Sequence, residues 1–428
     1  MALYAFILGN LPGLGISEIA SIYKRKKIPI TFQSLSQNVV IANTENELPI
    51  ALFGSVIKII KISKEFPLPK QEKFQNLLID SLAQKSPGKT ISKEYLLDLI
   101  FDQNKDKKIT FGLSVYGFPI SKEILTRIGL SLKKELKNAG VKSRFVAPQE
   151  QSALSSVVVK KQKITEIAII ITTNIKTGLP IISIGKTNQI FDFEDLNKRD
   201  FSRPFYDRRG MLPLKIAKMM INVATQNDND VVYDPFCGYG SIAQEALLLN
   251  FESLNSDIDS LQTQATKTNL EWLSQNYSLR KSWNIFTADA RSLPINLPHR
   301  PSTIVTEGYL GPFLKKSPSF KETNNIFNEL SSLYIKFLKN APNIEYLAII
   351  FPFFGNKTDP KRLFLKLVDD VKNIGYTIAC PLPKEFYIPQ LLKLLPDISK
   401  ECTFLYQRIT QIVGREIVIL KKINKPIS

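Results

Sequence analysis

The chain has 428 residues, 44% of them hydrophobic, and a formal net charge of +18 at pH 7. This length exceeds one average domain, so we expect two or three domains with packed cores. The positive charge predicts an anionic partner, nucleic acid before a membrane surface, with a lysine-rich proteome as the alternative explanation.

Cysteine and histidine usage argues against several kinds of site. Cys237, Cys380 and Cys402 are widely spaced and predict neither a disulfide framework nor a metal site. The single histidine, His299, lies in the turn-like LPHRPS, which argues against histidine catalysis and zinc binding. The opening MALYAFILGNLPG has no basic start and a short apolar run, which indicates a strand rather than a signal peptide. No stretch reaches the roughly 18 apolar residues of a membrane span, so we expect a cytoplasmic protein without membrane contact.

The N-terminal half is predicted to hold two α+β units, 1–65 and 70–185. The first unit has strands and one amphipathic helix, expected at 2–8, 15–27 (the helix), 38–44 and 55–63. The second has one helix among strands, expected at 108–117, 121–140 (the helix), 143–147, 155–161 and 166–173. Between the units, EFPLPKQEK contains two prolines and indicates a linker.

The helix predicted at 121–140 has a basic outer face. Its apolar positions recur at helical spacing, and Gly140 stands where a C-cap residue is expected. The cations on the other face are Lys122, Arg127, Lys133, Lys134 and Lys137. This face is either an ordinary solvated surface or a surface that contacts phosphate groups.

From residue 195 to 428, strands alternate with helices. The expected elements are helix 213–226, strand 231–234, helix 241–249, strand 253–257, helix 260–275, strands 284–288 and 302–306, helix 321–340, strand 345–352, helix 360–374 and strands 401–407 and 415–421. This alternation predicts a doubly wound, mainly parallel α/β sheet. Ligands of such sheets bind at the carboxyl ends of the strands.

The segment VVYDPFCGYGSIAQEALL, residues 231–248, predicts a strand, a glycine turn and a helix N-terminus. A phosphate ligand is disfavoured, because Gly240 is not followed by Lys-Ser/Thr and the turn has only two of the three glycines of the dinucleotide fingerprint. Asp234 would also repel a phosphate. A carboxylate there suits an ammonium group, and S-adenosylmethionine has one, plus a carboxylate for the helix amides. We therefore expect Asp234, Gly238 and Gly240 to bind S-adenosylmethionine.

Acidic residues also end the next two predicted strands. Asp257 follows the glycine turn at the distance at which an acidic residue can bind ribose hydroxyls. Asp289 is placed to accept from an adenine amino group, while Ala290 donates its backbone amide. Each aspartate alone could be a helix cap, but three at successive strand ends favour a methyltransferase.

Four segments resemble one family. DPFCGYGSIAQEA is similar to the glycine motif of THUMP-containing tRNA guanine-N2 methyltransferases of archaea and eukaryotes, and RDFSRPFYDRRGMLPLKIAKMMINVA to the Arg-Pro segment before it. YQRITQIVGREIVILKK resembles their closing hairpin, and SRFVAPQEQSALSSVVV their THUMP domain. The resemblance implies a ferredoxin-like domain at 1–65, a THUMP-like RNA-binding domain at 70–185 and a Rossmann-like class I methyltransferase domain at 195–428. That last domain would have a seven-stranded, mainly parallel sheet.

One motif departs from the family. Those enzymes have an Asp-Pro-Pro-Tyr type motif after strand four, whereas this chain has TIVTEGYLGPFL. Methylation of an exocyclic amine needs an acceptor for its hydrogens and a flat surface for the base. Glu307 could be the acceptor and Tyr309 the stacking surface.

The expected function is transfer of a methyl group from S-adenosylmethionine to a guanine N2 amine in tRNA. The alternatives are an amino-methyltransferase of rRNA or DNA, and a catalytically inactive, cofactor-binding RNA-interaction protein. The segment TEGY, residues 306–309, is the sequence feature that distinguishes these possible functions.

Overall fold

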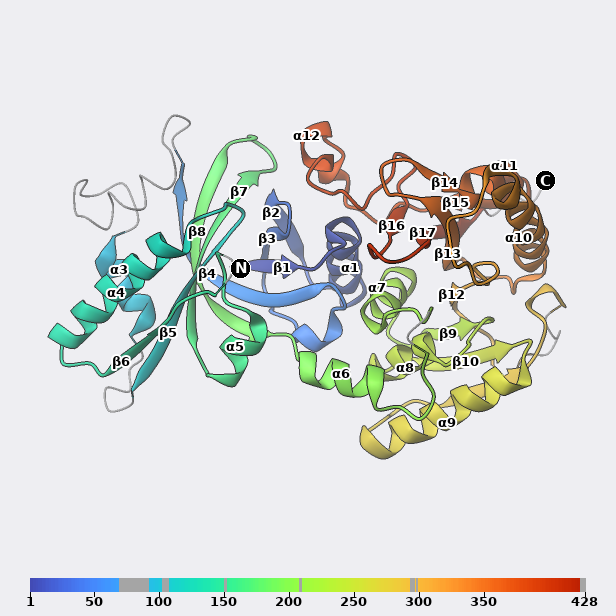
Figure 1. Ribbon diagram of the computed structural model, residues 1–428, viewed down its shortest axis with the longest axis horizontal. Coiled ribbons are helices and arrows are strands. Elements are labelled where there is room, and N and C mark those ends of the chain that lie inside the picture. The colour runs from blue at the N-terminus through green and yellow to red at the C-terminus, as the bar shows by residue number, and fades with distance from the viewer. Residues whose placement is uncertain are drawn as a thin grey trace.

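The computed structural model describes residues 1–68, 92–101, 108–149, 152–207, 210–292, 297 and 299–423. Figure 1 shows two α/β bodies side by side, with the N-terminal strands in one and the C-terminal strands in the other. Within the described residues, no helix is long and apolar enough to cross a membrane, and no cluster of three or more His, Cys, Asp or Glu residues could hold a metal ion.

The N-terminal body is built on one sheet, which has eight strands in the described part of the chain. Their order is β2-β3-β1-β4-β8-β7-β5-β6. The strands are β1 (Ala2–Leu8), β2 (Ile30–Ser36), β3 (Val39–Thr44), β4 (Val56–Pro67), β5 (Ile109–Tyr116), β6 (Ser143–Val146), β7 (Thr165–Asn174) and β8 (Pro180–Ile190). Antiparallel pairing of β4 with β8 joins the units predicted at 1–65 and 70–185 in a single sheet. Of the predicted linker, Glu65–Pro67 belongs to β4, and 69–73 lies outside the described residues.

Helices cover this sheet and lead out of it. They are α1 (Pro12–Arg25), α3 (Lys93–Ile100), α4 (Lys122–Asn138), α5 (Ser156–Lys161) and α6 (Phe193–Phe201). The basic helix is confirmed as α4: its buried face includes Leu125, Ile128 and Leu132, and Gly140 follows it with φ +76°.

The strand predicted at 155–161 is wrong, because these residues form α5. The Ser155 hydroxyl accepts a hydrogen bond from Val158 N at 3.3 Å and caps the helix. Only Val159 of the three valines is buried, whereas Val157 is 41% exposed. The segment pairs with no strand of the described sheet; as a helix it packs Val159 and Val158 in a small cluster with Val146 of β6 and Ile190 of β8.

The C-terminal sheet has nine strands among the described residues, seven of them on its main path, β11-β10-β9-β12-β13-β17-β15. Its strands are β9 (Val231–Asp234), β10 (Glu252–Asp257), β11 (Trp283–Thr287), β12 (Thr303–Glu307), β13 (Tyr346–Gly355), β14 (Pro360–Arg362), β15 (Tyr376–Ile378), β16 (Phe404–Tyr406) and β17 (Val413–Lys422). The pairs from β11 to β13 are parallel, and β17 is antiparallel to both β13 and β15. The order reverses between β9 and β12, which creates the switch point where ligands bind in such sheets.

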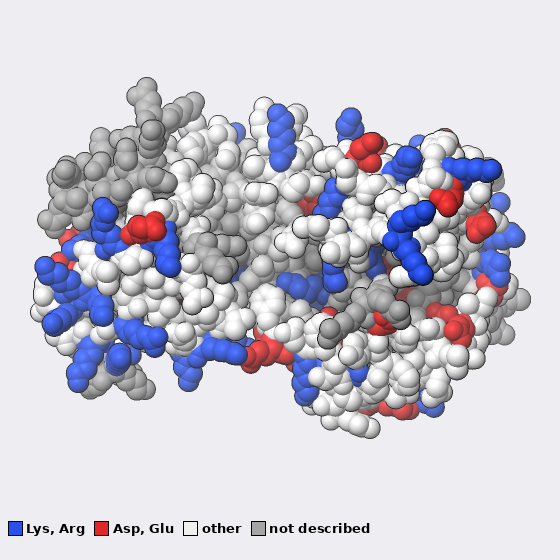
Figure 2. All heavy atoms as spheres, in the orientation of Figure 1, with Lys and Arg blue, Asp and Glu red and all other residues white. Residues whose placement is uncertain are grey.

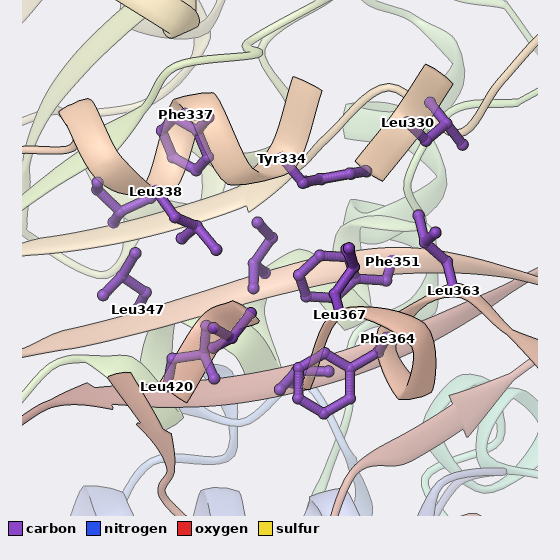
Figure 3. Packing of buried hydrophobic residues seen from close by; sticks show 14 of the residues in the cluster. Leu330, Tyr334, Phe337, Leu338, Leu347, Phe351, Leu363, Phe364, Leu367 and Leu420 are labelled. Atoms are coloured by element: carbon purple, nitrogen blue, oxygen red, sulfur yellow. The ribbon is translucent and has the colours of Figure 1, made fainter. Parts of the chain in front are cut away.

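Two helical layers enclose this sheet. The helices of the C-terminal body are α7 (Leu214–Ala224), α8 (Ser241–Leu248), α9 (Ser260–Asn276), α10 (Phe320–Asn340), α11 (Leu363–Asn373) and α12 (Pro389–Leu392). Strand β13 alternates between the layers: Leu347 and Phe351 pack with α10 and α11, as Figure 3 shows, whereas Ala348 and Ile350 pack with α7. A strand buried on both faces explains the continuous apolar run YLAIIFPFF.

Buried polar contacts fasten α1 of the N-terminal body to α7 of the C-terminal body. Arg25 donates to the Asn222 carbonyl at 3.1 Å, the Asn222 side-chain oxygen at 3.0 Å and the Thr225 hydroxyl at 2.6 Å. Glu18 accepts from the Asn222 amide at 2.8 Å and from the backbone amides of Gly54 and Ser55. The two bodies therefore share a desolvated polar interface.

The cysteines differ from the sequence expectation. Cys380 and Cys402 form a disulfide, with Cα atoms 5.5 Å apart, whereas Cys237 is free and buried. The two cysteines are 22 positions apart, and the pairing is not evident from the sequence, because η3 (Lys384–Phe386) and α12 fold the chain back on itself.

Candidate active site

Three predicted carboxylates end neighbouring strands at the switch point. Asp234, Asp257 and Glu307 are the last residues of β9, β10 and β12. Asp289 follows β11 by two residues. The structure therefore brings the sequence-predicted acidic residues to one edge of the sheet.

The glycine turn after β9 has the backbone conformation that its glycines suggest. Gly238 and Gly240 have φ angles of +49° and +80°. Residues with a side chain rarely adopt such angles, because their Cβ atom clashes with the backbone. Gly238 N donates to Asp257 at 3.0 Å and Gly238 O accepts from the Thr266 hydroxyl at 2.6 Å, so both neighbours hold the turn. A Cβ built on Gly238 meets nothing within 4 Å, and the turn is therefore open on that side.

Asp234 is buried, and no cation of the described residues forms an ion pair with it. Its Oδ1 accepts from Phe236 N at 3.1 Å and from the Thr306 hydroxyl at 2.7 Å, and the residue is 2% exposed. Burial raises the pKa of Asp234 to about 7, and the nearby charges of Asp257 and Glu307 act in the same direction. A carboxylate in this state gains most from a cationic ligand.

Asp257 and Asp289 have local partners as well. Besides Gly238, Asp257 accepts from Asp259 N at 3.0 Å, and Asp259 caps α9 by accepting from Leu261 N. The guanidinium of Arg291 binds Asp289 with distances of 2.6–3.0 Å and holds the pKa of that carboxyl below its usual range. Ala290 is buried in the short turn η2 (Ala290–Ser292).

The TEGY segment contains an ion pair that spans 108 residues of sequence. Arg415 of β17 donates from Nε to Glu307 Oε1 at 2.5 Å and from Nη2 to the Gly210 carbonyl at 2.7 Å. Burial raises the pKa of Glu307, whereas the positive charge of Arg415 acts to lower it. The pair fixes the direction of the Glu307 carboxylate.

Gly308, one of the residues that differ from the Asp-Pro-Pro-Tyr motif, packs closely against Tyr334. A Cβ on Gly308 would lie 2.5 Å from the Tyr334 hydroxyl oxygen, so a residue with a side chain does not fit there without movement. That hydroxyl donates to the Tyr309 carbonyl at 3.0 Å and lies 3.2 Å from the Ile350 carbonyl. Tyr309 itself is 54% exposed, and Phe313 in the same loop is 73% exposed. Tyr334 thus supports the turn while Tyr309 presents an open aromatic surface.

Comparison with known proteins agrees with this geometry. Residues 202–343 match the sequence family UPF0020, described as the RMKL-like methyltransferase domain. This segment includes all the strand-end carboxylates and the glycine turn. The chain carries a methyltransferase domain.

Two relatives of this methyltransferase domain are named as tRNA methyltransferases. A tRNA (guanine(10)-N2)-dimethyltransferase of Methanothermobacter thermautotrophicus is 30% identical over 131 residues, which cover 31% of this chain and 36% of that protein. The protein of the same name from Methanocaldococcus jannaschii is 38% identical over 73 residues, which cover 17% of this chain and 20% of that protein. The chain thus matches well under two thirds of these relatives' lengths. The resemblance to tRNA guanine-N2 methyltransferases is confirmed.

Solved structures of low sequence identity show the fold of the methyltransferase. TrmN from Thermus thermophilus has a TM-score of 0.51 at 14% identity and covers 98% of this chain and 100% of its own. A possible methylase from Clostridium difficile 630 has a TM-score of 0.52 at 11% identity and covers both chains fully. The Rossmann-like class I methyltransferase fold predicted for the C-terminal part is confirmed in its overall class.

Sequence reasoning missed two residues of this site, Tyr334 and Arg415. Arg415 carried the clearest signal, because it is a charged residue inside the apolar strand VGREIVIL. Charged residues in buried strands are rare unless paired. The partner, however, could only be found in three dimensions.

Proposed function

We propose that the protein is an S-adenosylmethionine-dependent methyltransferase that modifies a guanine N2 amine in tRNA. The observation that carries the proposal is the site itself: three carboxylates and a positive-φ glycine turn at the switch point of a methyltransferase domain. The relatives named as tRNA (guanine(10)-N2)-dimethyltransferases support the substrate. A tRNA substrate also fits the predicted cytoplasmic location.

The residues at the turn fit the cofactor. Asp234 is the buried acceptor for its ammonium group, Asp257 for the ribose hydroxyls, and Asp289 with Ala290 for the adenine edge. The open side of Gly238 leaves room for a ligand to approach the backbone. When bound, S-adenosylmethionine supplies an electrophilic methyl group on a sulfonium centre.

Glu307 and Tyr309 then act on the base. Tyr309 stacks on the guanine, since its ring is exposed beside the strand end. Glu307 accepts hydrogen bonds from the amine, which turns the nitrogen lone pair toward the methyl group and offsets the positive charge that develops on nitrogen. Arg415 favours the ionised form of Glu307 that this role requires. After transfer, one amine proton leaves to Glu307 or water.

We further propose that the N-terminal body, including the THUMP-like region, positions the RNA. Five lysines line a groove of about 650 Å³ between α4 and the start of β6: Lys108, Lys133, Lys134, Lys137 and Lys142. Figure 2 shows Lys and Arg side chains gathered at the end of the molecule where Figure 1 places α4 and β6. Phosphate contacts of this kind orient a nucleic acid without reading its bases.

Methyl transfer by the full chain tests the proposal. Unmodified tRNA is incubated with labelled S-adenosylmethionine, and its nucleosides are identified by mass spectrometry. We expect N2-methylguanosine with the native chain, and a rate reduced by at least about 100-fold with Glu307→Gln, which keeps the shape but not the charge. Glu329→Gln, a change of an exposed α10 carboxylate, is the control and should leave the rate unchanged.

The other outcomes decide between the alternatives. Methylation of rRNA or of adenine in DNA, but not of tRNA, would move the substrate to another nucleic acid. Cofactor binding without transfer to any nucleic acid would favour the inactive RNA-interaction protein. An unchanged rate for Glu307→Gln would remove Glu307 from catalysis.

A further inference from the structure

The hairpin of β16 and β17 extends beyond the edge of the sheet at which the candidate active site lies. Glu307, the last residue of β12, pairs with Ile350 of β13, and Ile350 pairs with Ile417 of β17. Because β17 is antiparallel to β13, the residues before Ile417 run past the strand ends that carry the carboxylates. Residues 407–412, between β16 and β17, form the tip of the hairpin. Figure 1 shows both strands in the C-terminal body, close to β13.

Hydrogen bonds give this tip a fixed shape. The Gln407 amide donates to the Gly355 carbonyl at the end of β13 and to the Gln411 carbonyl, each at 3.0 Å. Gln411 N donates to the Arg408 carbonyl at 3.0 Å, and Arg408 N donates to Gln411 Oε1 at 3.2 Å. Arg408 Nε also donates to the Tyr406 hydroxyl at 2.8 Å. The tip is therefore bonded both within itself and to the neighbouring strand.

The tip lies beside the candidate active site. Arg415, near the base of the hairpin, forms the ion pair with Glu307. On the other side of the tip, burial raises the pKa of Asp200 of α6, whereas the positive charges of Arg203 and Arg408 act to lower it. Arg408 is therefore close to α6, and the hairpin stands between the end of β13 and the segment that leads into the methyltransferase domain.

Ile409 is the apolar residue at this tip, and its side chain is fully exposed. The flanking residues, Arg408 and Thr410, are exposed and polar. A single exposed aliphatic residue has no meaning by itself. Its place on a rigid hairpin beside Glu307 gives it one, because proteins that open nucleic acid helices insert apolar side chains between base steps.

The proposed acceptor is recessed, which requires the base to leave its helix. The side chain of Glu307 is 17% exposed and is held by Arg415. A guanine within an RNA helix is stacked between neighbours, and its amine faces the partner base, so it reaches such a carboxylate only after extrusion. Extrusion leaves a gap between apolar base faces. An apolar side chain that fills the gap stabilises the open helix.

We propose that Ile409 is a wedge that enters the stack of an RNA helix where the target guanine leaves it. The inference rests on the proposed function and deepens it, because it places the substrate guanine in a base-paired part of the tRNA. Ile409 is a positioning residue: it holds the helix open and touches no reacting atom.

The test measures methyl transfer by the full chain to two tRNAs that differ at one base. The first tRNA is unaltered, and the second carries a base that cannot pair opposite the guanine that the native chain methylates. Ile409→Ala should be slower than the native chain by at least about 10-fold on the unaltered tRNA and within about 2-fold of it on the other, because an unpaired base is the easiest to extrude. Ile409→Leu should keep most of the native rate on both tRNAs.

Ile423→Ala is the matched control. Ile423 is an exposed isoleucine directly after β17, at the opposite edge of the same sheet, so its removal should leave both rates unchanged. The thermal midpoint of Ile409→Ala and its affinity for S-adenosylmethionine should equal those of the native chain, because the side chain is fully exposed.

The remaining outcomes overturn defined statements. A native rate for Ile409→Ala on the unaltered tRNA would show that Ile409 is not the wedge, although the proposed function stands. An equal loss on both tRNAs would assign Ile409 to RNA contact and not to opening of the helix. Methylation by the native chain of unpaired guanines alone would remove the need for a wedge. If the native chain methylates no tRNA, the proposed function fails together with the inference.

Discussion

Burial raises the pKa of both Asp234 and Glu307, and within the described part of the chain Glu307 has an ion-pair partner whereas Asp234 has none. Arg415 lies 2.5 Å from Glu307 and favours its ionised form, which suits an acceptor for an amine. Asp234 has a hydroxyl and a backbone amide as partners, so its carboxyl titrates near neutral pH. The two carboxyls therefore suit different tasks: Glu307 is paired with a guanidinium of the chain, whereas Asp234 would be paired by a cationic ligand.

The binding of S-adenosylmethionine should depend on pH through Asp234. The ammonium group requires the ionised carboxylate, and the pKa of Asp234 without ligand is about 7. Affinity should therefore fall by up to about tenfold per pH unit below pH 7. Calorimetry between about pH 5.5 and 6.7 measures this fall at least one pH unit below the pKa of about 7.7–8.0 of a free α-amino group.

Asp234→Asn is the control for this dependence, because it cannot titrate, and its affinity should be weaker and flat with pH. The stability of the ligand-free protein should depend on pH in the opposite direction, because ionisation of Asp234 lowers stability. A folded pKa of about 7, raised from 3.8, means that the contribution of Asp234 to stability is complete below about pH 4 and is lost as the pH rises through 7. A native affinity that does not change with pH would contradict the role of Asp234.

At the scale of elements, the helix pair α1 and α7 connects the N-terminal body, which we propose positions the RNA, to the C-terminal body, which carries the proposed site of methyl transfer. Asn222 of α7 is the centre of this contact, because it is fully buried and forms hydrogen bonds with both Glu18 and Arg25 of α1. Asp397 adds a second link by accepting from the backbone amides of Gly13 and Leu14 at the start of α1. Such contacts fix the distance between an RNA-binding surface and the site of methyl transfer.

Asn222→Ala should destabilise the whole chain. The change leaves the Glu18 carboxylate and the Arg25 guanidinium each without one buried partner, at a cost of about 1–3 kcal/mol. Denaturant unfolding of the full chain measures the loss. Asn276→Ala, at the exposed end of α9, is the control and should stay within about 0.5 kcal/mol of the native chain. Equal midpoints for the two variants would show that the interface adds nothing to stability.

At the scale of the molecule, a cluster of lysines lies on the N-terminal body, away from the strand-end carboxylates. The lysine groove lies on the N-terminal body, whereas the glycine turn and TEGY lie on the other (Figures 1 and 2). A substrate that reaches both must be long and anionic. This arrangement favours a structured RNA over a small molecule.

Charge reversal in the groove tests this arrangement. The triple change Lys133→Glu, Lys134→Glu and Lys137→Glu should weaken tRNA binding and reduce the slope of log affinity against log salt by about 2 to 3, the value expected for three lost phosphate contacts. S-adenosylmethionine binding should not change. The same charge change on the other body, Lys267→Glu, Lys321→Glu and Lys339→Glu, is the control. Equal tRNA affinities and slopes for the two triple variants would exclude the groove as the RNA surface.

The sequence alone determined the features that depend on neighbours in the chain. The strand, glycine turn and helix at 231–248 follow from local apolar runs and from glycines that adopt positive φ angles, and the alternation of elements implied the parallel sheet and the position of Asp234, Asp257 and Glu307 at strand ends. The roles of these residues stay predictions.

Only the tertiary structure decided which distant residues meet. It paired Glu307 with Arg415, placed Tyr334 under Gly308, joined the two N-terminal units through β4 and β8, and turned the valine-rich segment 155–161 into a helix. It also buried the side chain of Arg203 near the Ser241 hydroxyl at the start of α8. The physical reason is that burial and pairing depend on contacts between elements far apart in the chain, and these contacts set the energy of a charge far more than its sequence neighbours do.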